Sequence, residues 1–289
     1  MHTASAMSRK KKNRNKGKNK KPKGPPQASV SDRHVLYQQS VQNVEAEIDF
    51  VDDTYKELRG RHATLLREDF CGTAHTSCEW LKRRPTNKAI GVDLDESVLE
   101  WGTTHNLDPL DDNARNRITL KRDDVTTIQT EPVDIILAMN FSYFCFKTRE
   151  ALRGYFKNVL RSLADDGMLI MDCYGGAEAH LEQEEERDID GDFTYVWDQA
   201  KFDPISSHMT CHIHFHFDDG SKMRKAFSYD WRMWTLPEIR ELLEEAGFKK
   251  STVYWEGTDE EEEEGNGEFT AAEEGEADPA WIAYIVAEK

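Results

Sequence analysis

Apolar residues recur along positions 41–58 at spacings of three and four, which places them on one face of a helix. Ser31 or Asp32 can cap the N-terminal end of this region, and Gly60 stands where such a helix would stop. We therefore expect an N-terminal helical cap over residues 29–60, with a buried stripe made of Val41, Val44, Ile48, Val51, Tyr55 and Leu58.

From residue 61 onward, short apolar runs alternate with segments of helical period. The helix expected after the fourth run has Thr148 as its cap. This rhythm predicts an α/β fold, a parallel sheet with helices on both faces and ligands at the carboxyl ends of its strands. The strand-like runs are residues 63–66, 88–93, 117–124, 133–140 and 167–174.

The C-terminal third changes to alternating, aromatic segments typical of antiparallel strands. Residues 218–221 read as a hairpin turn, so we expect a β-rich insertion over about 190–234. A helix follows in which Thr235 and Glu238 have capping-box spacing and Gly247 marks the end. Two final strands are expected at 250–255 and 281–289.

Charge is distributed unevenly along the 289 residues. Acids outnumber bases 55 to 38, for a net charge of −17. Residues 1–28 hold ten Lys or Arg and no acid, so the rest of the chain has 28 bases, 55 acids and a net charge of −27. We expect a disordered basic tail over 1–28 and a disordered acidic loop over 256–278, because neither can bury enough apolar surface. The acidic segment 181–192 is expected to be a mobile surface segment.

The basic tail leaves two interpretations open. Its residues 9–23 can contact nucleic acid weakly through phosphates, or the tail can simply be solvated. The composition argues against several other classes. No apolar run approaches the ~18 residues of a membrane span, and the start lacks the apolar stretch of a secretory signal. The five cysteines lack CxxC spacing, which favours a reducing, cytoplasmic location over a disulfide scaffold.

The loop after the first strand, residues 67–77, has features of a ligand site. Gly72 lies among small residues ahead of a helix, so backbone N–H groups can approach an anion closely. Asp93 ends the second strand 21 residues beyond Gly72, where a carboxylate can accept both hydroxyls of a ribose. Asp123 and Asp124 end the third strand, where they can bind an adenine amino group. The layout suits adenosine bearing a small anionic group, with Leu94 and Val125 on either side of the ring.

Two nucleotide motifs are absent. The chain has neither GxGxxG nor GxxxxGK[ST], which counts against a dinucleotide site and excludes a P-loop.

The stretch from Glu68 to Ala74, followed by Asp93 and Asp124-Val125, resembles class I S-adenosylmethionine-dependent methyltransferases of the small-molecule type. Phe70 and Ala74 stand where that family usually has glycine. The resemblance covers about residues 35–289 and implies a Rossmann-like sheet of seven strands whose last strand is antiparallel. It implies S-adenosyl-L-methionine as cofactor, bound by Tyr37, Glu68, Cys71, Gly72, Thr73, Ala74, Asp93, Leu94, Asp123, Asp124, Val125 and Asn140.

In-line methyl transfer requires alignment of the acceptor and exclusion of water. Asn140, Tyr143 and Tyr174 follow the strand ends and are the candidate catalytic residues. Aromatic walls can hold an amine or a flat acceptor, and Arg232 can bind a carboxylate. The candidate substrate-binding residues are Tyr195, Trp197, Tyr229, Trp231 and Arg232. Residues 139–144 lack the prolines of the [DN]PP[YFW] motif, which counts against methylation of DNA adenine or glutamine.

His212, His214 and His216 share one strand face. Ligands along one flat strand lie ~7 Å apart and fit a tetrahedral metal poorly, so we expect no metal site there. Cys71 is expected to be a packing residue, because no base accompanies it.

The leading hypothesis is a methyltransferase for a small-molecule acceptor. Alternatives are an RNA- or protein-directed methyltransferase tethered by the tail, a non-catalytic binding protein with the same fold, and an NAD-dependent enzyme. The sequence does not indicate the oligomeric state.

Overall fold

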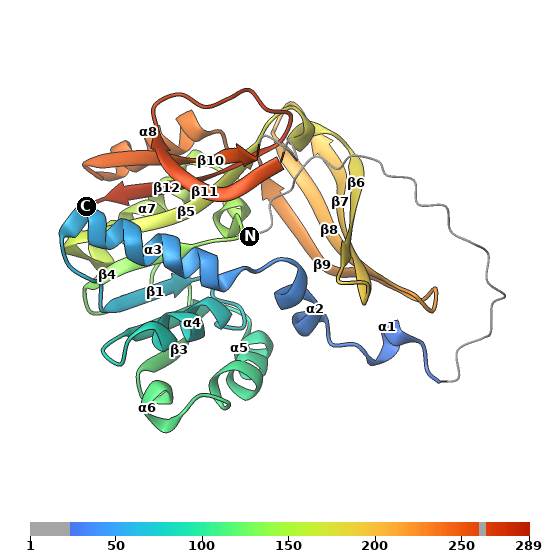
Figure 1. Ribbon diagram of the computed structural model, residues 1–289. Helices are drawn as coiled ribbons and strands as arrows, with labels where there is room; N and C mark the ends of the chain where they lie inside the picture. The colour runs from blue at the N-terminus through green and yellow to red at the C-terminus, as the bar shows by residue number, and fades with distance from the viewer. Residues whose placement is uncertain (1–23, 260–263) are drawn as a thin grey trace.

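A computed structural model describes residues 24–259 and 264–289, which form two β-sheets joined by helices (Figure 1). The large sheet has eight strands in the order β11-β10-β12-β5-β4-β1-β2-β3, and the second has four in the order β6-β7-β8-β9. The strands are β1 Leu65–Asp69, β2 Lys88–Asp93, β3 Ile118–Arg122, β4 Val133–Ala138, β5 Leu163–Gly175, β6 Gln183–Ile189, β7 Phe193–Asp203, β8 His208–Phe217, β9 Lys222–Arg232, β10 Lys250–Asp259, β11 Glu264–Ala272 and β12 Trp281–Glu288.

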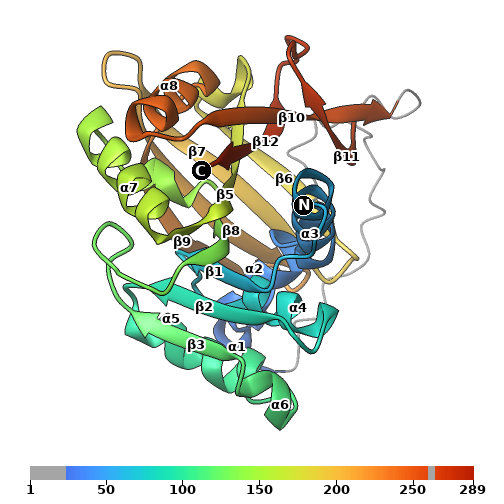
Figure 2. The ribbon, with the colours of Figure 1, turned by 90° about the vertical axis from the view of Figure 1, so that its left-hand side faces the viewer.

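The helices lie on both faces of the large sheet, as the alternating pattern predicted. Figure 2 shows α7 and α8 on one side of the sheet and α3 and α4 on the other. Each face has its own buried cluster, one around Phe156 and Leu242 and one around Ile48 and Trp80. The α-helices are α1 Gln27–Val30, α2 Arg33–Ser40, α3 Val44–Arg59, α4 His75–Arg83, α5 Glu96–Gly102, α6 Asp112–Arg115, α7 Arg149–Ser162 and α8 Leu236–Ala246.

The connectivity confirms the expected sheet, with one added strand. Strands β1 to β5 pair in parallel, and β12 is antiparallel to both β5 and β10. The antiparallel last strand is therefore confirmed. The sheet has eight strands rather than seven because β11 pairs with the edge strand β10.

The N-terminal region is divided more finely than its periodicity predicted. Residues 41–43 interrupt the helix, so Asp32 caps α2 and Asn43 caps α3. Gly60 ends α3 at φ 67°, a left-handed conformation that favours glycine. Of the expected tail, residues 1–23 lie outside the described part. Residues 27–30 instead form α1, where the N–H of Gln27 donates to Asp219 at 2.8 Å.

Two acidic segments predicted to be irregular contain strands. Residues 183–189 of the expected mobile segment are β6, which pairs with β7 from Gln183 to Ile189. Much of the expected acidic loop belongs to β10 and β11, paired from Val253 onward. An acidic segment can form a strand when its acids face water on one side of the sheet, because water solvates their charges while the backbone hydrogen-bonds to the neighbouring strand. Residues 260–263 lie outside the described part.

The β-rich insertion and the helix after it match their predicted signals. Strands β7, β8 and β9 pair antiparallel, with Gly220 at φ 84° in the turn. Thr235 and Glu238 form a complete capping box at the start of α8. One face of this second sheet packs on α2 through Phe215, Phe193 and Leu36. No helix within residues 24–259 and 264–289 combines the length and apolar character needed to cross a membrane.

Candidate active site at the carboxyl ends of the strands

The loop between β1 and α4 forms an open backbone turn tied to the end of β2. Gly72 has φ 51°, and a Cβ placed on it would meet only Val98 Cγ1 at 3.8 Å. The N–H of Gly72 donates to Asp93 Oδ2 at 2.8 Å, and the N–H of Asp95 donates to Asp93 Oδ1 at 2.9 Å. Gly72 and Asp93, both predicted cofactor residues, are thus brought together, and the backbone of Gly72 carries no side chain that would block a close approach.

The two departures from the glycine pattern retain a glycine-like backbone. Phe70 has φ 57° and Ala74 has φ 56°, both left-handed. Such positions cost non-glycine residues on the order of 1–3 kcal/mol and persist where surrounding contacts enforce them. The ring of Phe70 packs 5.7 Å from that of Tyr155, and Ala74 is fully buried. The loop keeps its shape through packing rather than through flexibility of glycine.

Three buried carboxyl groups lie beneath this loop, on the α3 and α4 face of the sheet. We call Glu47, Glu68 and Asp172 the buried acid cluster. Glu68 accepts hydrogen bonds from the Ser77 N–H at 2.9 Å and the Ser77 hydroxyl at 2.5 Å. In addition to burial, the charge of Glu47 raises the pKa of both Glu68 and Asp172, so Glu47 lies close to each of them.

The buried acid cluster shapes the loop after β4. Asp172 accepts from the N–H of Asn140 at 2.7 Å and from the N–H of Phe141 at 2.8 Å. Both of these residues have positive φ, 57° and 55°. Burial raises the pKa of Asp172 to about 7, and burial raises the pKa of Glu68 to about 8. These groups change charge near neutral pH.

Glu47 and Asp172 are the members of the buried acid cluster that the sequence analysis did not predict. Glu47 is 0% exposed, and its Oε2 accepts a hydrogen bond from the Thr76 hydroxyl at 3.5 Å. Burial raises the pKa of Glu47, although the backbone of Asn43 also hydrogen-bonds to its carboxyl group and lowers that pKa. Its Oε1 is buried with no partner in the described part of the chain. A signal was present in the sequence. Glu47 lies between Val44 and Val51 on the apolar face of α3, where an acid is costly without a cation.

Helix α2 covers the loop. Gln38 donates from Nε2 to the Thr73 hydroxyl at 2.9 Å, and Trp101 donates from Nε1 to Asp32 at 2.7 Å. Tyr37, predicted as a lid residue, packs 4.9 Å from the Phe227 ring of β9. Tyr37 also senses the charges of Glu47 and Asp172, so the lid residue lies near the buried acid cluster.

The ends of β2 and β3 carry the side chains predicted to surround adenine. Leu94 is 65% exposed, which leaves an apolar side chain uncovered at this edge. Asp124 Oδ1 accepts from the N–H and the hydroxyl of Thr126 at 2.8 and 2.7 Å. Asp123 is exposed, and Val125 is buried at 5% exposure in the core. Leu94 and one oxygen of Asp124 are therefore available to a ligand.

Aromatic rings from the two sheets meet beside Asn140. The ring of Phe141 lies 4.6 Å from Tyr174 and 6.3 Å from Trp231. Trp231 in turn lies 4.4 Å from Tyr229 and 6.0 Å from Trp197. Asn140 contributes an Oδ1 that is buried without a partner in the described part of the chain. We call the five rings of Phe141, Tyr174, Trp197, Tyr229 and Trp231 the aromatic wall.

Three predicted residues have other tasks in the structure. Tyr143 is 0% exposed and its hydroxyl donates to the Asp172 carbonyl at 2.7 Å, so it is a core residue and does not face an acceptor. Arg232 lies 3.8 Å over the Trp234 ring and donates to Glu238 at 3.0 Å, so its charge is already paired. Tyr195 packs on Phe215 and under Arg187. Their residue types resembled ligand groups, but burial and pairing were not visible in the sequence.

Cys71 supports packing rather than nucleophilic chemistry at this edge. All five cysteines are free. Cys71 is buried beneath Gly91, where an added Cβ would lie 2.9 Å from its sulfur, and burial raises the pKa of its thiol. A thiol held protonated is a poor nucleophile, in line with the packing role expected for Cys71.

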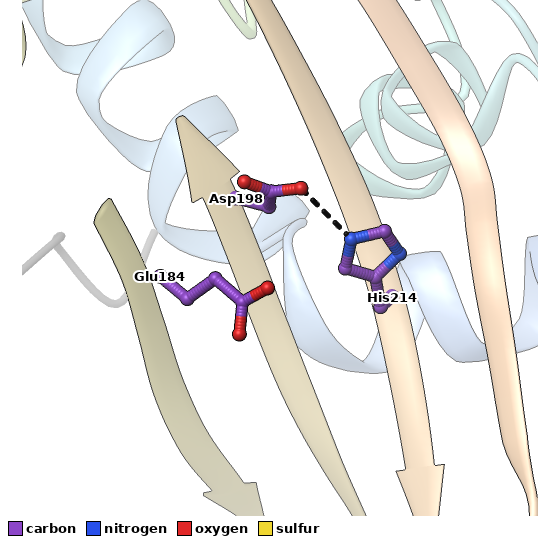
Figure 3. Close-up of side chains that lie close together, drawn as sticks. All are labelled: Glu184, Asp198 and His214. Atoms are coloured by element: carbon purple, nitrogen blue, oxygen red, sulfur yellow. Dashed lines mark hydrogen bonds and ion pairs between the residues drawn. The ribbon is translucent and has the colours of Figure 1, made fainter. Parts of the chain in front are cut away.

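A second acidic group lies on the outer sheet. Ligand atoms of Glu184, Asp198 and His214 all fall within 4.8 Å of one another (Figure 3). The Lys225 N–H donates to His214 Nδ1 at 2.6 Å, so the ring proton is on Nε2, which donates to Asp198 at 3.1 Å. A metal would need the Nε2 lone pair, which this tautomer lacks. The group is a His–Asp hydrogen bond between strands beside an exposed glutamate.

Solved structures with this architecture come from several bacteria. A Clostridium acetobutylicum S-adenosylmethionine-dependent methyltransferase has a TM-score of 0.64 at 15% identity, covering 88% of this chain and 96% of its own. An amino pentose methyltransferase from Micromonospora echinaspora, solved with S-adenosylmethionine, has a TM-score of 0.62 at 15% identity and covers 88% and 95%. A sugar N-methyltransferase from a Streptoalloteichus species has a TM-score of 0.58 at 14% identity and covers 96% and 99%.

These likenesses show the fold. No protein-family model and no curated protein sequence matches the chain. The chain has the Rossmann-like fold of class I S-adenosylmethionine-dependent methyltransferases, with an inserted antiparallel sheet.

Proposed function

We propose that this protein is a methyltransferase that binds S-adenosyl-L-methionine and methylates a small-molecule acceptor. The observation that carries the proposal is the buried Oε1 of Glu47, which has no partner in the described chain and lies in a cluster of three buried acids. A fully buried carboxyl group without a partner costs on the order of 1–3 kcal/mol or more. A cationic ligand offsets that cost, and the cofactor carries an ammonium group and a sulfonium.

The remaining residues suit the other parts of the cofactor. Asp93 would bind the ribose hydroxyls, since its two oxygens retain acceptor capacity beyond the N–H groups of Gly72 and Asp95. Asp124 and the exposed Leu94 would contact adenine, and Gly72 would allow close approach. Glu47 and Asn140 Oδ1 would receive the ammonium group.

The cofactor supplies an activated methyl group, so the chain's own residues only bind, orient and exclude water. The aromatic wall would hold the acceptor next to Asn140, either by cation–π contact with an amine or by stacking on a flat ring. Helix α2 would close the site, because Gln38 and Trp101 tie it to the loop and to α5. The Tyr143 hydroxyl, bonded to a carbonyl, takes no part.

A small-molecule acceptor is favoured by the neighbours and by charge. The solved neighbours are described as amino pentose and sugar N-methyltransferases. The chain beyond residue 28 carries −27, which repels nucleic acid. A nucleic-acid or protein acceptor would depend on residues 9–23, which lie outside the described part.

The experiment is isothermal titration calorimetry with S-adenosylmethionine, S-adenosylhomocysteine and NADH. We expect both S-adenosyl ligands to bind and NADH to give no heat. Asp93→Asn keeps one acceptor oxygen for Gly72 and should weaken binding about tenfold or more, through lost charge-assisted hydrogen bonds. Asp192→Asn, an exposed acid in the β6–β7 turn, is the matched control. Equal affinity of both variants would refute the ribose assignment.

Turnover is measured separately, as S-adenosylhomocysteine formed with a panel of small amines and amino sugars. Tight cofactor binding with no methyl transfer to any acceptor would favour a non-catalytic binding protein.

A further inference from the structure

One cavity in the described part of the chain is lined by none of the residues predicted to bind the cofactor. It borders the buried acid cluster, because its lining residue Tyr284 pairs in register with Asp172 and senses the charges of Glu47 and Asp172. It holds about 650 Å³ between α3 and the hairpin of β10 and β11. Its floor is aromatic: the Tyr284 ring stacks 4.1 Å from Phe269 and lies 4.5 Å from Phe50, which in turn meets Tyr254 edge-on at 5.2 Å. None of these four residues belongs to the aromatic wall, and none was a predicted site residue.

Carboxylates surround this aromatic floor. Asp53 and Glu57 on α3 and Glu268 on β11 are exposed, and Glu256 on β10 is half-buried. None of the four forms an ion pair with a residue in the described ranges, whereas Asp49, which also lines the cavity, pairs with Arg83 at 3.0 Å. Asp53, Glu57 and Glu268 repel one another and Glu256, whose pKa burial raises to about 7, and a bound cation would offset that repulsion.

Two details show that specific contacts hold a carboxylate of the cavity wall in place and leave a buried hydroxyl without a partner in the described chain. Glu256 is held by the Gly267 N–H at 3.0 Å, and a Cβ on Gly265 would lie 2.5 Å from its carboxyl carbon. The absence of a side chain at Gly265 therefore makes room for this carboxylate. Tyr284 is only 2% exposed and lines the cavity, yet its hydroxyl has no hydrogen-bond partner in the described chain. A buried phenol that faces a cavity without a partner indicates a polar ligand.

We propose that this cavity binds an aliphatic amine with two or more positive charges, of the polyamine class. Aromatic faces attract ammonium groups, and carboxylates spaced around them suit an elongated cation with several charges. The Tyr284 hydroxyl would accept a hydrogen bond from one ammonium group. A hard divalent metal fits less well, because among the described residues no three acids of this cavity bring their ligand oxygens within 4.8 Å of one another.

The test is calorimetry of the full chain with spermidine at low ionic strength, where surface charges are least screened. We expect one saturable site per chain. Asp53→Asn combined with Glu256→Gln should weaken spermidine about tenfold or more, through two lost charge contacts. Phe50→Leu should weaken it about threefold, through a lost cation–π contact. Glu131→Gln, an exposed acid distant in sequence from the cavity, should leave the affinity unchanged.

Three results would overturn the proposal. One is the absence of saturable spermidine binding. Another is equal weakening by the cavity variants and by Glu131→Gln, which would indicate general charge attraction. The third is spermidine binding that appears only in a variant in which the Lys and Arg residues of 9–23 are changed to Ser. That result would mean that the chain's own basic segment, and not a free polyamine, occupies the cavity. Because S-adenosylmethionine is titrated separately, failure here is distinguishable from failure of the proposed function.

Discussion

Two groups of three titratable side chains in this protein, the buried acid cluster and the outer-sheet group of Glu184, Asp198 and His214, differ in how their polar atoms are hydrogen-bonded. In the buried acid cluster, Glu47 is fully buried with an oxygen that has no partner in the described chain. On the outer sheet, His214 is almost as buried, at 3% exposure, but both of its ring nitrogens are hydrogen-bonded. The first arrangement leaves a buried carboxylate oxygen without a hydrogen-bond partner in the described chain, and the second leaves no ring nitrogen of His214 unpaired.

The difference teaches which features of a site carry information. In Figure 3, two acids and a histidine lie close together, an arrangement that suggests a metal site. The histidine tautomer fixed by the hydrogen bonds of His214 argues against that interpretation. The closeness of Glu47, Glu68 and Asp172 would, by itself, also not indicate a ligand site. The missing partner and the left-handed loop distinguish the buried acid cluster from the outer-sheet group, and on that ground we propose that the cluster binds a ligand.

The largest effect is expected from filling the loop of the first region. Gly72→Val would place a branched side chain in the space beside Asp93 and would strain a φ of 51°. Cofactor affinity should fall by at least about 100-fold, because the close backbone approach is blocked. Calorimetry measures this, and Gly154→Ala in α7, where a Cβ meets nothing within 4 Å, is the control. Wild-type affinity in a folded Gly72→Val protein would disprove the loop assignment.

The second region should respond in stability alone. His214→Phe leaves the Lys225 N–H and Asp198 without partners and should lower the free energy of unfolding by about 1–3 kcal/mol. Chemical denaturation measures the change, and the exposed Glu184→Gln should have little effect. Cofactor affinity should not change. A zinc-dependent rise in melting temperature that His214→Phe abolishes would show that a metal site exists there.

Replacing Glu47 should change the free energy of unfolding in the opposite direction, toward greater stability. Glu47→Leu eliminates a buried carboxyl group whose Oε1 has no hydrogen-bond partner in the described chain, so the ligand-free protein should gain about 1 kcal/mol in free energy of unfolding. The exposed Glu45→Leu on the same helix is the control. A loss of stability in Glu47→Leu would mean that this carboxyl group is satisfied in the free protein.

The smallest effect concerns pH. Burial raises the pKa of Asp172 to about 7 and that of Glu68 to about 8. Raised pKa values in carboxyl groups mean that ionisation opposes folding, so their contribution to stability declines as pH rises from about 4 to 8. A cationic ligand prefers the ionised form. Cofactor affinity should therefore increase from pH 6 to pH 8.5, with proton release detectable by calorimetry in buffers of different ionisation enthalpy; proton uptake would contradict this.

Local sequence signals predicted much of the fold because they act over short distances. Thr148, Thr235 with Glu238, and Gly247 all cap helices as expected, since capping depends on neighbouring backbone groups. The helix break at 41–43 and strand β11 were missed. Apolar spacing continues across the break, and the acids on β11 are compatible with either water or a strand.

The site was predictable where the chain itself fixes the geometry. Gly72 and Asp93 come together because parallel strands end at one edge. Glu47 was missed because its helix folds over that edge from outside the motif. Arg232 and Tyr143 were misjudged because pairing with Glu238 and burial in the core depend on distant packing.

The most direct test of the central claim compares two ligands on Glu47→Gln. S-Adenosylhomocysteine carries the amino acid part of the cofactor, and methylthioadenosine lacks it. If Glu47 receives the ammonium group, Glu47→Gln should weaken S-adenosylhomocysteine about tenfold or more and leave methylthioadenosine unchanged, because one charge-assisted contact is lost. Equal effects on both ligands, or none on either, would contradict the account.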